Sequence, residues 1–233
     1  MTLERLDIHA CEDKFQVALH RARYDFALQY LQPADSVLEI GTGLGVFTEE
    51  LCRRCARYTG VEYDEASCQA ARQRTNANVL QGDARHLSFP DNHFSYIICL
   101  EVLEHLGDWK AGVTGIHRCL SPDGRAVISV PWRRTGGKSA LNEHHLYEPG
   151  ERELVTMLSA RFRKVDVFYQ YFEESAVMTV ARGLRIRRLL GLDRNYADLT
   201  RGLPEATARL RIGPVGKGMK LGLIIAASGK KQL

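Results

Sequence analysis

The sequence predicts an α/β fold in which helices cover both faces of a mostly parallel β-sheet. Short apolar runs alternate with amphipathic segments along the 233 residues, as expected for repeated strand–helix units. Residues 94–100 are nearly all apolar, which is typical of a central parallel strand buried on both faces. Residues 37–47 pass from an apolar run through a glycine-rich turn into a segment with helical spacing, which is the usual first unit of a nucleotide-binding α/β domain.

Helical periodicity dominates the N-terminal part of the chain. Residues 11–31 carry apolar side chains at near-helical spacing and predict one or two amphipathic helices. Residues 32–35 contain a proline and end this segment, so residues 1–35 are expected to form a helical cap that acts as a lid. The core of the domain is then expected over residues 36–172.

Seven strands and four further helices are expected after the cap. Residues 121–124 predict a turn before the fifth strand, and residues 133–142 predict a polar loop after it. Parallel strands joined through helices bring their carboxyl ends to one edge of the sheet, so chemistry is expected there. The predicted strands span 36–40, 58–62, 78–81, 94–100, 126–130, 165–172 and 221–227, and the predicted helices span 45–54, 64–74, 108–120 and 149–160.

A basic insertion separates the sixth strand from the last one. Residues 173–220 contain ten Lys or Arg against five Asp or Glu. We expect this insertion to be helical and to cover the substrate side of the domain, with its arginines in solvent. The alternative is a basic amphipathic helix over 176–192 that contacts anionic lipid at a membrane surface. The apolar side chains that share one helical face are Val177, Val180, Ala181 and Leu184.

Length and composition indicate a single globular domain over residues 1–233. The chain has 45% hydrophobic and 26% charged residues, and residues 221–229 are expected to supply its last strand. The net charge of +4 does not by itself argue for nucleic-acid or membrane binding. No apolar run is long enough to span a membrane, and the polar N-terminus argues against a signal peptide, so a cytoplasmic location is predicted.

The six cysteines are expected to be reduced, because their spacing does not resemble a secreted disulfide framework. Cys52 and Cys55 have the spacing of a zinc or redox pair. They fall one turn apart on a predicted helix without a second ligand pair nearby, so no zinc site is expected there.

The glycine-rich turn indicates which ligand the domain takes. Gly41, Gly43 and Gly45 lead into a helix, whose first backbone N–H groups can bind a carboxylate. A dinucleotide site would have glycine or alanine where this chain has Val46, and Glu39 would repel a pyrophosphate. A carboxylate at position 39 instead suits a cationic amine, and acidic surroundings suit a sulfonium. The turn therefore favours a cofactor with an amino-acid moiety.

The segment Glu39–Gly45 resembles the first motif of class I S-adenosylmethionine-dependent methyltransferases. Four further segments resemble later motifs of this family and occur in the same order. Ser95 stands where the family usually has aspartate and Asp123 where it has glycine, and neither departure affects a cofactor contact. The resemblance implies a Rossmann-like sheet of seven strands, the last of them antiparallel. The four segments are residues 60–64, 82–84, 94–98 and 120–124.

The resemblance also implies S-adenosyl-L-methionine as the cofactor. Glu62 would bind the ribose, because one carboxylate can accept hydrogen bonds from two adjacent hydroxyls. Asp83 would accept a hydrogen bond from the exocyclic amine of adenine. The expected cofactor-binding residues are Glu39, Gly41, Thr42, Gly43, Gly45, Glu62, Tyr63, Asp83, Ala84, Leu100 and Glu101.

Two histidines are candidates for the general base. His105 follows the fourth strand, where the methyl acceptor is expected, and His145 follows the fifth. Residues 100–106 are similar to ubiquinone-pathway O-methyltransferases. They also resemble small-RNA 2′-O-methyltransferases, in which a Glu-x-x-Glu-His stretch and a later His hold a divalent metal. We favour the interpretation without a metal. On the pattern of the small-RNA methyltransferases, the metal ligands would be Glu101, Glu104, His105 and His145.

The predicted reaction is methylation of a hydroxyl on a small molecule, such as a phenol, a quinol precursor, a sugar or a natural product. No nucleic-acid partner is expected. Methylation of nitrogen, of carbon or of an RNA 2′-hydroxyl is an alternative, and so is a protein that binds the cofactor without catalysis. An NAD-dependent oxidoreductase is opposed by Val46 and Glu39.

Overall fold

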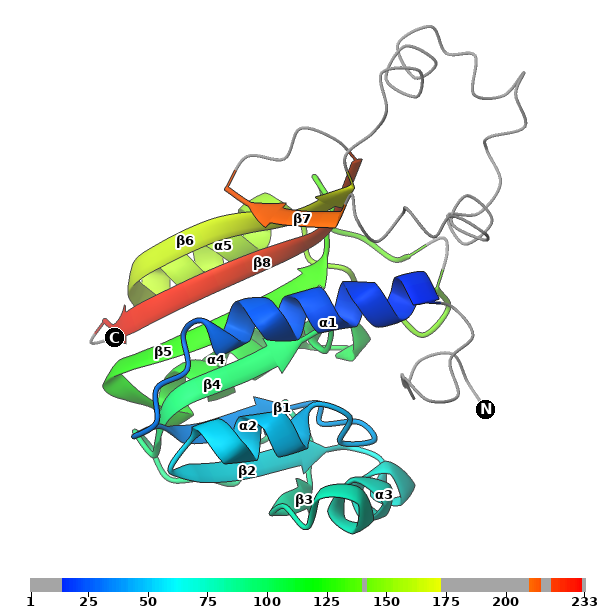
Figure 1. The fold of residues 1–233 in the computed structure, drawn as a ribbon. Helices are drawn as coiled ribbons and strands as arrows, with labels where there is room; N and C mark the ends of the chain where they lie inside the picture. The colour runs from blue at the N-terminus through cyan, green and yellow to red at the C-terminus, as the bar shows by residue number, and fades with distance from the viewer. Residues whose placement is uncertain (1–13, 140–141, 173–209, 215–218, 232–233) are drawn as a thin grey trace, which may run out of the picture.

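The computed structural model describes residues 14–139, 142–172, 210–214 and 219–231. Its centre is an eight-stranded sheet in the order β3-β2-β1-β4-β5-β8-β6-β7 (Figure 1). The strands from β3 to β5 are parallel, β8 is antiparallel to both β5 and β6, and β7 is antiparallel to β6. The strands are β1 Ser36–Ile40, β2 Arg57–Glu62, β3 Val79–Gln81, β4 Phe94–Leu100, β5 Leu120–Pro131, β6 Phe162–Phe172, β7 Leu210–Gly213 and β8 Met219–Lys230.

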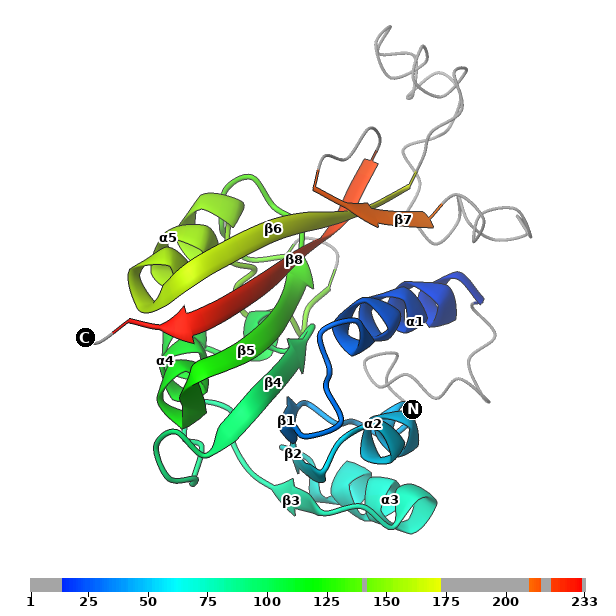
Figure 2. The ribbon, with the colours of Figure 1, turned by 60° about the vertical axis from the view of Figure 1, so that its left-hand side comes forward.

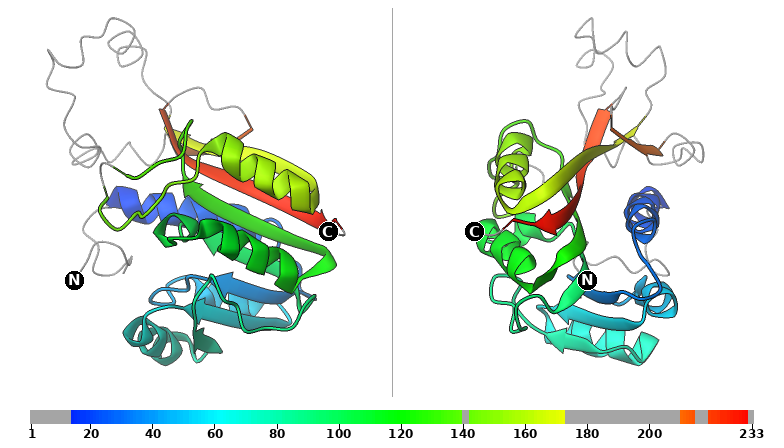
Figure 3. Two further views of the ribbon diagram at one scale, coloured as in Figure 1. Left: turned by 180° about the vertical axis from the view of Figure 1, so that it is seen from behind. Right: turned by 90° about the vertical axis from the view of Figure 1, so that its left-hand side faces the viewer.

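Helices form a layer on each face of this sheet. Figures 2 and 3 show α1, α2 and α3 on one face and α4 and α5 on the other. None of the described helices has the length and hydropathy needed to cross a bilayer. The helices are α1 Lys14–Leu28, α2 Thr48–Arg54, α3 Glu65–Thr75, α4 Trp109–Cys119 and α5 Glu151–Arg161, and η1 Leu103–His105 is a short 3-10 helix.

The predicted α/β architecture is confirmed, with one strand more than expected. Leu210–Gly213 forms β7 and pairs with residues 169–172 of β6, although this stretch was expected to be helical. A short strand can satisfy its backbone groups on the open edge of β6 without an apolar pattern of its own. The remaining insertion up to residue 209, including the predicted lipid-contacting helix 176–192, lies outside the described residues.

The expected turn at residues 121–124 is wrong, because β5 already begins at Leu120. Leu120 pairs with Phe94 and Arg125 pairs with Tyr96, so the register shifts between these two pairs. The additional residues of β5 therefore form an irregularity in a continuous strand. Turn residues such as Pro122 and Gly124 are tolerated at such a bulge.

Apolar packing on both faces fixes the central strands. Val37 and Leu38 are adjacent in β1 and both are fully buried, since successive strand residues point to opposite faces. Val37 belongs to the apolar cluster that includes Phe26 of α1, whereas Leu38 belongs to the cluster that includes Val113 of α4. The apolar run of β4 is nearly continuous for the same reason, because its side chains are buried on both faces of the sheet. These contacts hold the carboxyl ends of β1 and β4 side by side beneath the site.

Asp35 anchors the opposite end of β1 through a buried ion pair. The side chain of Asp35 is 6% exposed, and its carboxylate accepts two hydrogen bonds from Arg125, at 2.7 and 2.9 Å. Ser95 Oγ donates to the same carboxylate at 2.7 Å and accepts from the Ser36 amide at 3.0 Å. An aspartate at position 95 would place a second carboxylate against Asp35. The exchange of the family's aspartate for Ser95 therefore matches its surroundings.

Replacing Asp35 by alanine is expected to lower the free energy of unfolding by about 3 kcal/mol, because Arg125 would lose its countercharge. Urea denaturation followed by circular dichroism measures this loss. The matched control is Asp123→Ala, which removes a partner from Arg163 at a side chain that is 91% exposed. The control should cost less than about 1 kcal/mol. Equal losses for the two variants would contradict the assigned role of Asp35.

Candidate active site

The glycine turn between β1 and α2 has a backbone that other residues adopt poorly. Gly41, Gly43 and Gly45 have φ angles of 79°, 57° and 71°. A Cβ on Gly41 would collide with Val102, and a Cβ on Gly45 would lie 3.0 Å from Ala71 of α3. Beside Gly43, in contrast, no described atom comes within 4 Å of a Cβ position. The turn is packed on two sides and open at its middle glycine.

Glu62 at the end of β2 faces this turn. Its Oε2 accepts a hydrogen bond from the Gly43 amide at 2.9 Å, and its Oε1 accepts one from the Asp64 amide at 3.0 Å. The residue is 7% exposed. Tyr63 follows it and is 69% exposed. The structure thus brings together the turn and the acid that the sequence assigned to the same ligand.

Glu39 is engaged within the protein. It accepts hydrogen bonds from Tyr24 Oη at 2.5 Å, from Tyr58 Oη and from Thr48 Oγ1. The residue is 1% exposed, and this burial raises the pKa of its carboxyl group. Glu39 thereby ties β1 to α1, α2 and β2 directly below the turn. Its expected contact with a cofactor amine stays a prediction.

Asp83 lies in the loop after β3 and forms a local ion pair. Arg85 donates to its carboxylate from Nε at 3.0 Å and from Nη2 at 2.5 Å, and the Arg85 amide donates at 2.8 Å. These hydrogen bonds hold the pKa of Asp83 below its ordinary value. Ala84 beside it is 8% exposed. The carboxylate is therefore ionised and able to accept only.

Leu100 ends β4, and Glu101 follows it in a left-handed conformation with φ of 55°. This conformation is strained for a residue with a side chain, and such strain is common at functional sites. The Glu101 carboxylate accepts from Ser129 Oγ of β5 at 2.7 Å and pairs with Arg23 of α1 at 3.0 Å. Two elements, β5 and α1, thus hold the Glu101 side chain in place.

Glu104 and the two candidate bases meet close to Glu101. The ligand atoms of Glu104, His105 and His145 all lie within 4.8 Å of one another. Glu104 is fully buried, and neither carboxylate oxygen has a hydrogen-bond partner among the described residues. Burial and the neighbouring Glu101 raise the pKa of Glu104. The rings of His105 and His145 meet edge to face, with centroids 4.7 Å apart.

Each histidine is oriented through its Nδ1. His105 Nδ1 lies 3.2 Å from the carbonyl oxygen of His144, and His145 Nδ1 lies 2.6 Å from Glu148. Glu148 also accepts from Arg133 at 2.8 Å. Burial opposes ionisation of Glu148, but its hydrogen bonds from His145, Arg133 and Ser139 lower its pKa to about 2. These contacts orient both rings beside Glu104, with one nitrogen of each within 4.8 Å of a Glu104 oxygen.

All these groups belong to one edge of the sheet. Figure 1 shows β1, β2, β4 and β5 pointing the same way, so the turn, Glu62, η1 and the loop with His145 lie beyond the same strand ends. Sequence reasoning missed Arg23 and Glu148. Arg23 lies in a helix that the sequence predicts only as part of the N-terminal cap. Glu148 stands just before a predicted helix and belongs to no motif. No sequence signal ties either residue to the site.

The profile of a family described as a methyltransferase domain matches residues 38–128, which include the turn, Glu62, Asp83 and η1. The chain carries a class I S-adenosylmethionine-dependent methyltransferase domain. A probable S-adenosylmethionine-dependent methyltransferase of Mycolicibacterium smegmatis is 29% identical over 162 residues, 68% of this chain and 63% of that protein. A ubiquinone biosynthesis O-methyltransferase of Pseudomonas aeruginosa is 30% identical over 100 residues, 40% of this chain and 43% of that protein. The chain thus covers less than two thirds of these curated relatives.

Two solved structures share the fold of this domain. The YcgJ protein of Bacillus subtilis has a TM-score of 0.62 at 18% identity, covering 91% of this chain and all of that one. The N-methyltransferase NodS of Bradyrhizobium japonicum has a TM-score of 0.60 at 19% identity, covering 94% and 93% of the two chains. These likenesses concern the fold alone and do not identify the methyl acceptor.

Proposed function

We propose that this methyltransferase domain transfers the methyl group of S-adenosyl-L-methionine to a hydroxyl oxygen of a small molecule. The observation that carries the proposal is the convergence of the glycine turn, Glu62 and the Glu104–His105–His145 cluster beyond the same strand ends. The similarity to a ubiquinone biosynthesis O-methyltransferase favours an oxygen acceptor. The similarity to the N-methyltransferase NodS concerns the fold alone.

The turn and the acids after β2 and β3 supply the cofactor contacts in this proposal. The open space beside Gly43 admits the ligand, and the nearby backbone N–H groups take its carboxylate. Glu62 accepts from the ribose hydroxyls. Asp83 accepts from the adenine amine, and Ala84 lines the adenine. Tyr63, Leu100 and Glu101 complete the set at the ends of β2 and β4, while Gly41, Thr42 and Gly45 shape the turn.

Methyl transfer requires alignment of the acceptor oxygen with the bond between the methyl carbon and the sulfonium. The oxygen forms a bond to the methyl carbon as the carbon–sulfur bond breaks, and the electron pair of that bond goes to sulfur. The hydroxyl proton goes to Nε2 of His145 or His105. Glu148 stabilises the imidazolium at His145, because it already accepts from Nδ1.

A divalent cation at the same cluster is the second candidate feature. Glu104, His105 and His145 fit such an ion, because the two oxygens of Glu104 are buried without partners and both imidazoles have their Nδ1 engaged. A bound cation would lower the pKa of an acceptor hydroxyl. The sequence pattern also includes Glu101 as a fourth ligand. We leave it out of this ligand set, because Arg23 and Ser129 already bind its carboxylate.

The test is a methyl-transfer assay with labelled S-adenosyl-L-methionine and panels of phenols, catechols, sugars and primary amines, read by mass spectrometry. Labelled product is expected from hydroxyl acceptors. Cofactor binding without transfer to any acceptor would contradict catalysis, and transfer to amines alone would contradict the oxygen acceptor. Calorimetry that detects NAD but no S-adenosyl-L-methionine would overturn the cofactor.

A further inference from the structure

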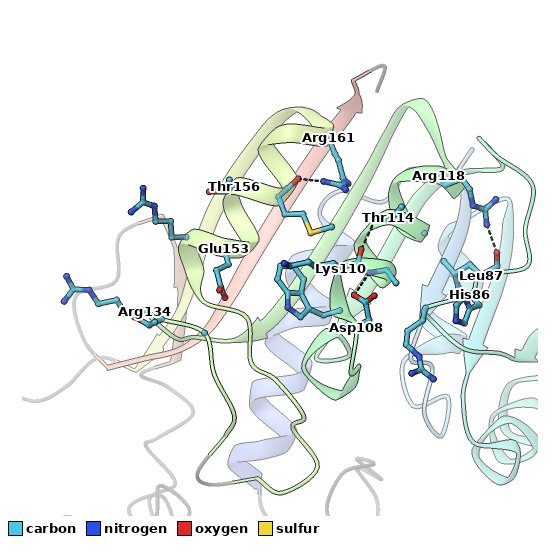
Figure 4. Close-up of a pocket in the computed structure, with 18 residues that line it drawn as sticks. His86, Leu87, Asp108, Lys110, Thr114, Arg118, Arg134, Glu153, Thr156 and Arg161 are labelled. Carbon is cyan, nitrogen blue, oxygen red and sulfur yellow. Dashed lines mark hydrogen bonds between the residues drawn. The ribbon is translucent and has the colours of Figure 1, made fainter.

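A large groove lies between α4 and α5 (Figure 4). These two helices lie on the face of the sheet opposite α1, α2 and α3 (Figure 3). The volume of the groove is about 1230 Å³. Residues 85–87 after β3 and residues 134–136 after β5 complete its walls. Small-molecule sites usually enclose roughly 300–1,000 Å³. The groove therefore has room for a segment of a macromolecule.

The walls of this groove are strongly basic. Figure 4 shows Arg134 towards one side and Arg118 towards the other, with Lys110 between them. The acids Asp108 and Glu153 accept hydrogen bonds from backbone amides, Asp108 from Ala111 at 3.1 Å and Glu153 from Gly150 at 3.0 Å. These acids thus cap the starts of α4 and α5. The basic residues of the groove are Arg85, Lys110, Arg118, Arg134, Arg152 and Arg161.

Three of these cations are available for a partner. Arg85 and Arg118 pair with Asp83 and Asp91, respectively. Lys110, Arg134 and Arg152 are exposed and form no ion pair within the part of the chain that the structure describes. Such unpaired cations along one groove attract an acidic ligand.

The apolar residues of the groove indicate whether an acidic peptide or a nucleic-acid strand fits it better. Its apolar lining residues are Leu87, Trp109, Ala111 and Met157, of which Ala111 and Met157 are partly exposed. A nucleic-acid strand would need exposed aromatic rings for base stacking, but Trp109 is only 5% exposed. An apolar floor between basic walls instead complements a peptide with one apolar and one acidic face. Grooves of this kind bind amphipathic helices.

We propose that the groove between α4 and α5 docks an acidic amphipathic segment of a partner protein. Apolar side chains of that segment pack on Ala111 and Met157, and its carboxylates pair with Lys110, Arg134 and Arg152. Guanidinium groups suit this role, because they bind carboxylates in a bidentate manner. The proposal is independent of which acceptor the domain methylates.

The test uses a fluorescein-labelled peptide in which leucine recurs at helical spacing and glutamate fills the other positions. Fluorescence anisotropy with the full chain should show saturable binding that weakens with added salt. The double variant Arg134→Glu/Arg152→Glu should bind at least about tenfold more weakly. The matched control is Arg53→Glu/Arg54→Glu, which reverses two exposed arginines of α2 on the other face. This control should change affinity less than about twofold.

Thermal melts by circular dichroism verify that both double variants are folded. If the groove variant does not fold, the single variant Lys110→Glu replaces it with the same expectation. Absence of peptide binding to the wild type would overturn the proposal. So would equal loss in the two double variants, or tighter binding of a lysine-for-glutamate peptide or of an oligouridylate RNA.

Discussion

Replacement of Glu62 by alanine is expected to weaken S-adenosyl-L-methionine binding about 100-fold. The ribose hydroxyls would lose a carboxylate acceptor, and hydrogen bonds to charged groups are each worth about 1.5–3 kcal/mol. The Gly43 amide would also lose the oxygen that it reaches at 2.9 Å. Isothermal titration calorimetry with the purified chain measures the change in Kd directly.

The matched control for this variant is Glu65→Ala. Glu65 lies three residues further along, in the first turn of α3, and its 43% exposed side chain pairs with Arg72. Its removal should leave cofactor affinity within about twofold. Glu62→Gln should fall between the wild type and Glu62→Ala, because the amide keeps one acceptor oxygen. Unchanged affinity in Glu62→Ala would show that the ribose assignment is wrong.

Most of the fold could be predicted from the sequence, because apolar periodicity and turn chemistry are local signals. The run 94–100 became β4 with the same bounds, and residues 36–40 became β1. Glycines with positive φ stand where the turn was expected. β7 was not predictable, because its four residues have no pattern of their own and pair only where β6 offers an open edge.

The candidate site was predictable only where one motif carries its geometry. The approach of Glu62 to Gly43 follows from the strand–turn–helix order and the parallel pairing of β1 with β2. The partners of Glu101 did not follow, since Arg23 lies 78 positions away and contacts it only after α1 packs on the sheet. Side-chain pairing over such separations depends on tertiary contacts that periodicity does not encode.

The polar groups around Glu101 and Glu104 explain why the cap belongs to the site. Arg23 of α1 supplies the only described cation that pairs with Glu101, and the same helix supplies Tyr24 to Glu39. One turn of α1 therefore contacts both Glu39 and Glu101, at the ends of the adjacent strands β1 and β4. Movement of α1 would remove one partner from each carboxylate, so the cap is a structural part of the cofactor side of the domain.

Replacement of His145 by alanine is expected to lower kcat for methyl transfer at least about 100-fold, because general acid–base groups contribute roughly 10²–10⁴-fold. The KM for S-adenosyl-L-methionine should change little, since His145 is not among the residues assigned to the cofactor. Steady-state kinetics with an acceptor from the panel gives both constants. His144→Ala is the matched control: its side chain is 42% exposed, against 13% for His145, and alanine keeps the carbonyl that orients His105.

Metal binding separates the two roles of His145. If the cluster holds a cation, Mn²⁺ should bind the wild type in calorimetry, and both His145→Ala and Glu104→Gln should abolish this binding, while His144→Ala retains it. Chelation should then lower the wild-type kcat as far as His145→Ala does. Full activity after exhaustive chelation would dismiss the cation and leave His145 as the base, with Glu148 on its Nδ1. A His145→Ala variant as active as His144→Ala would contradict both roles, because each requires the imidazole beside Glu104.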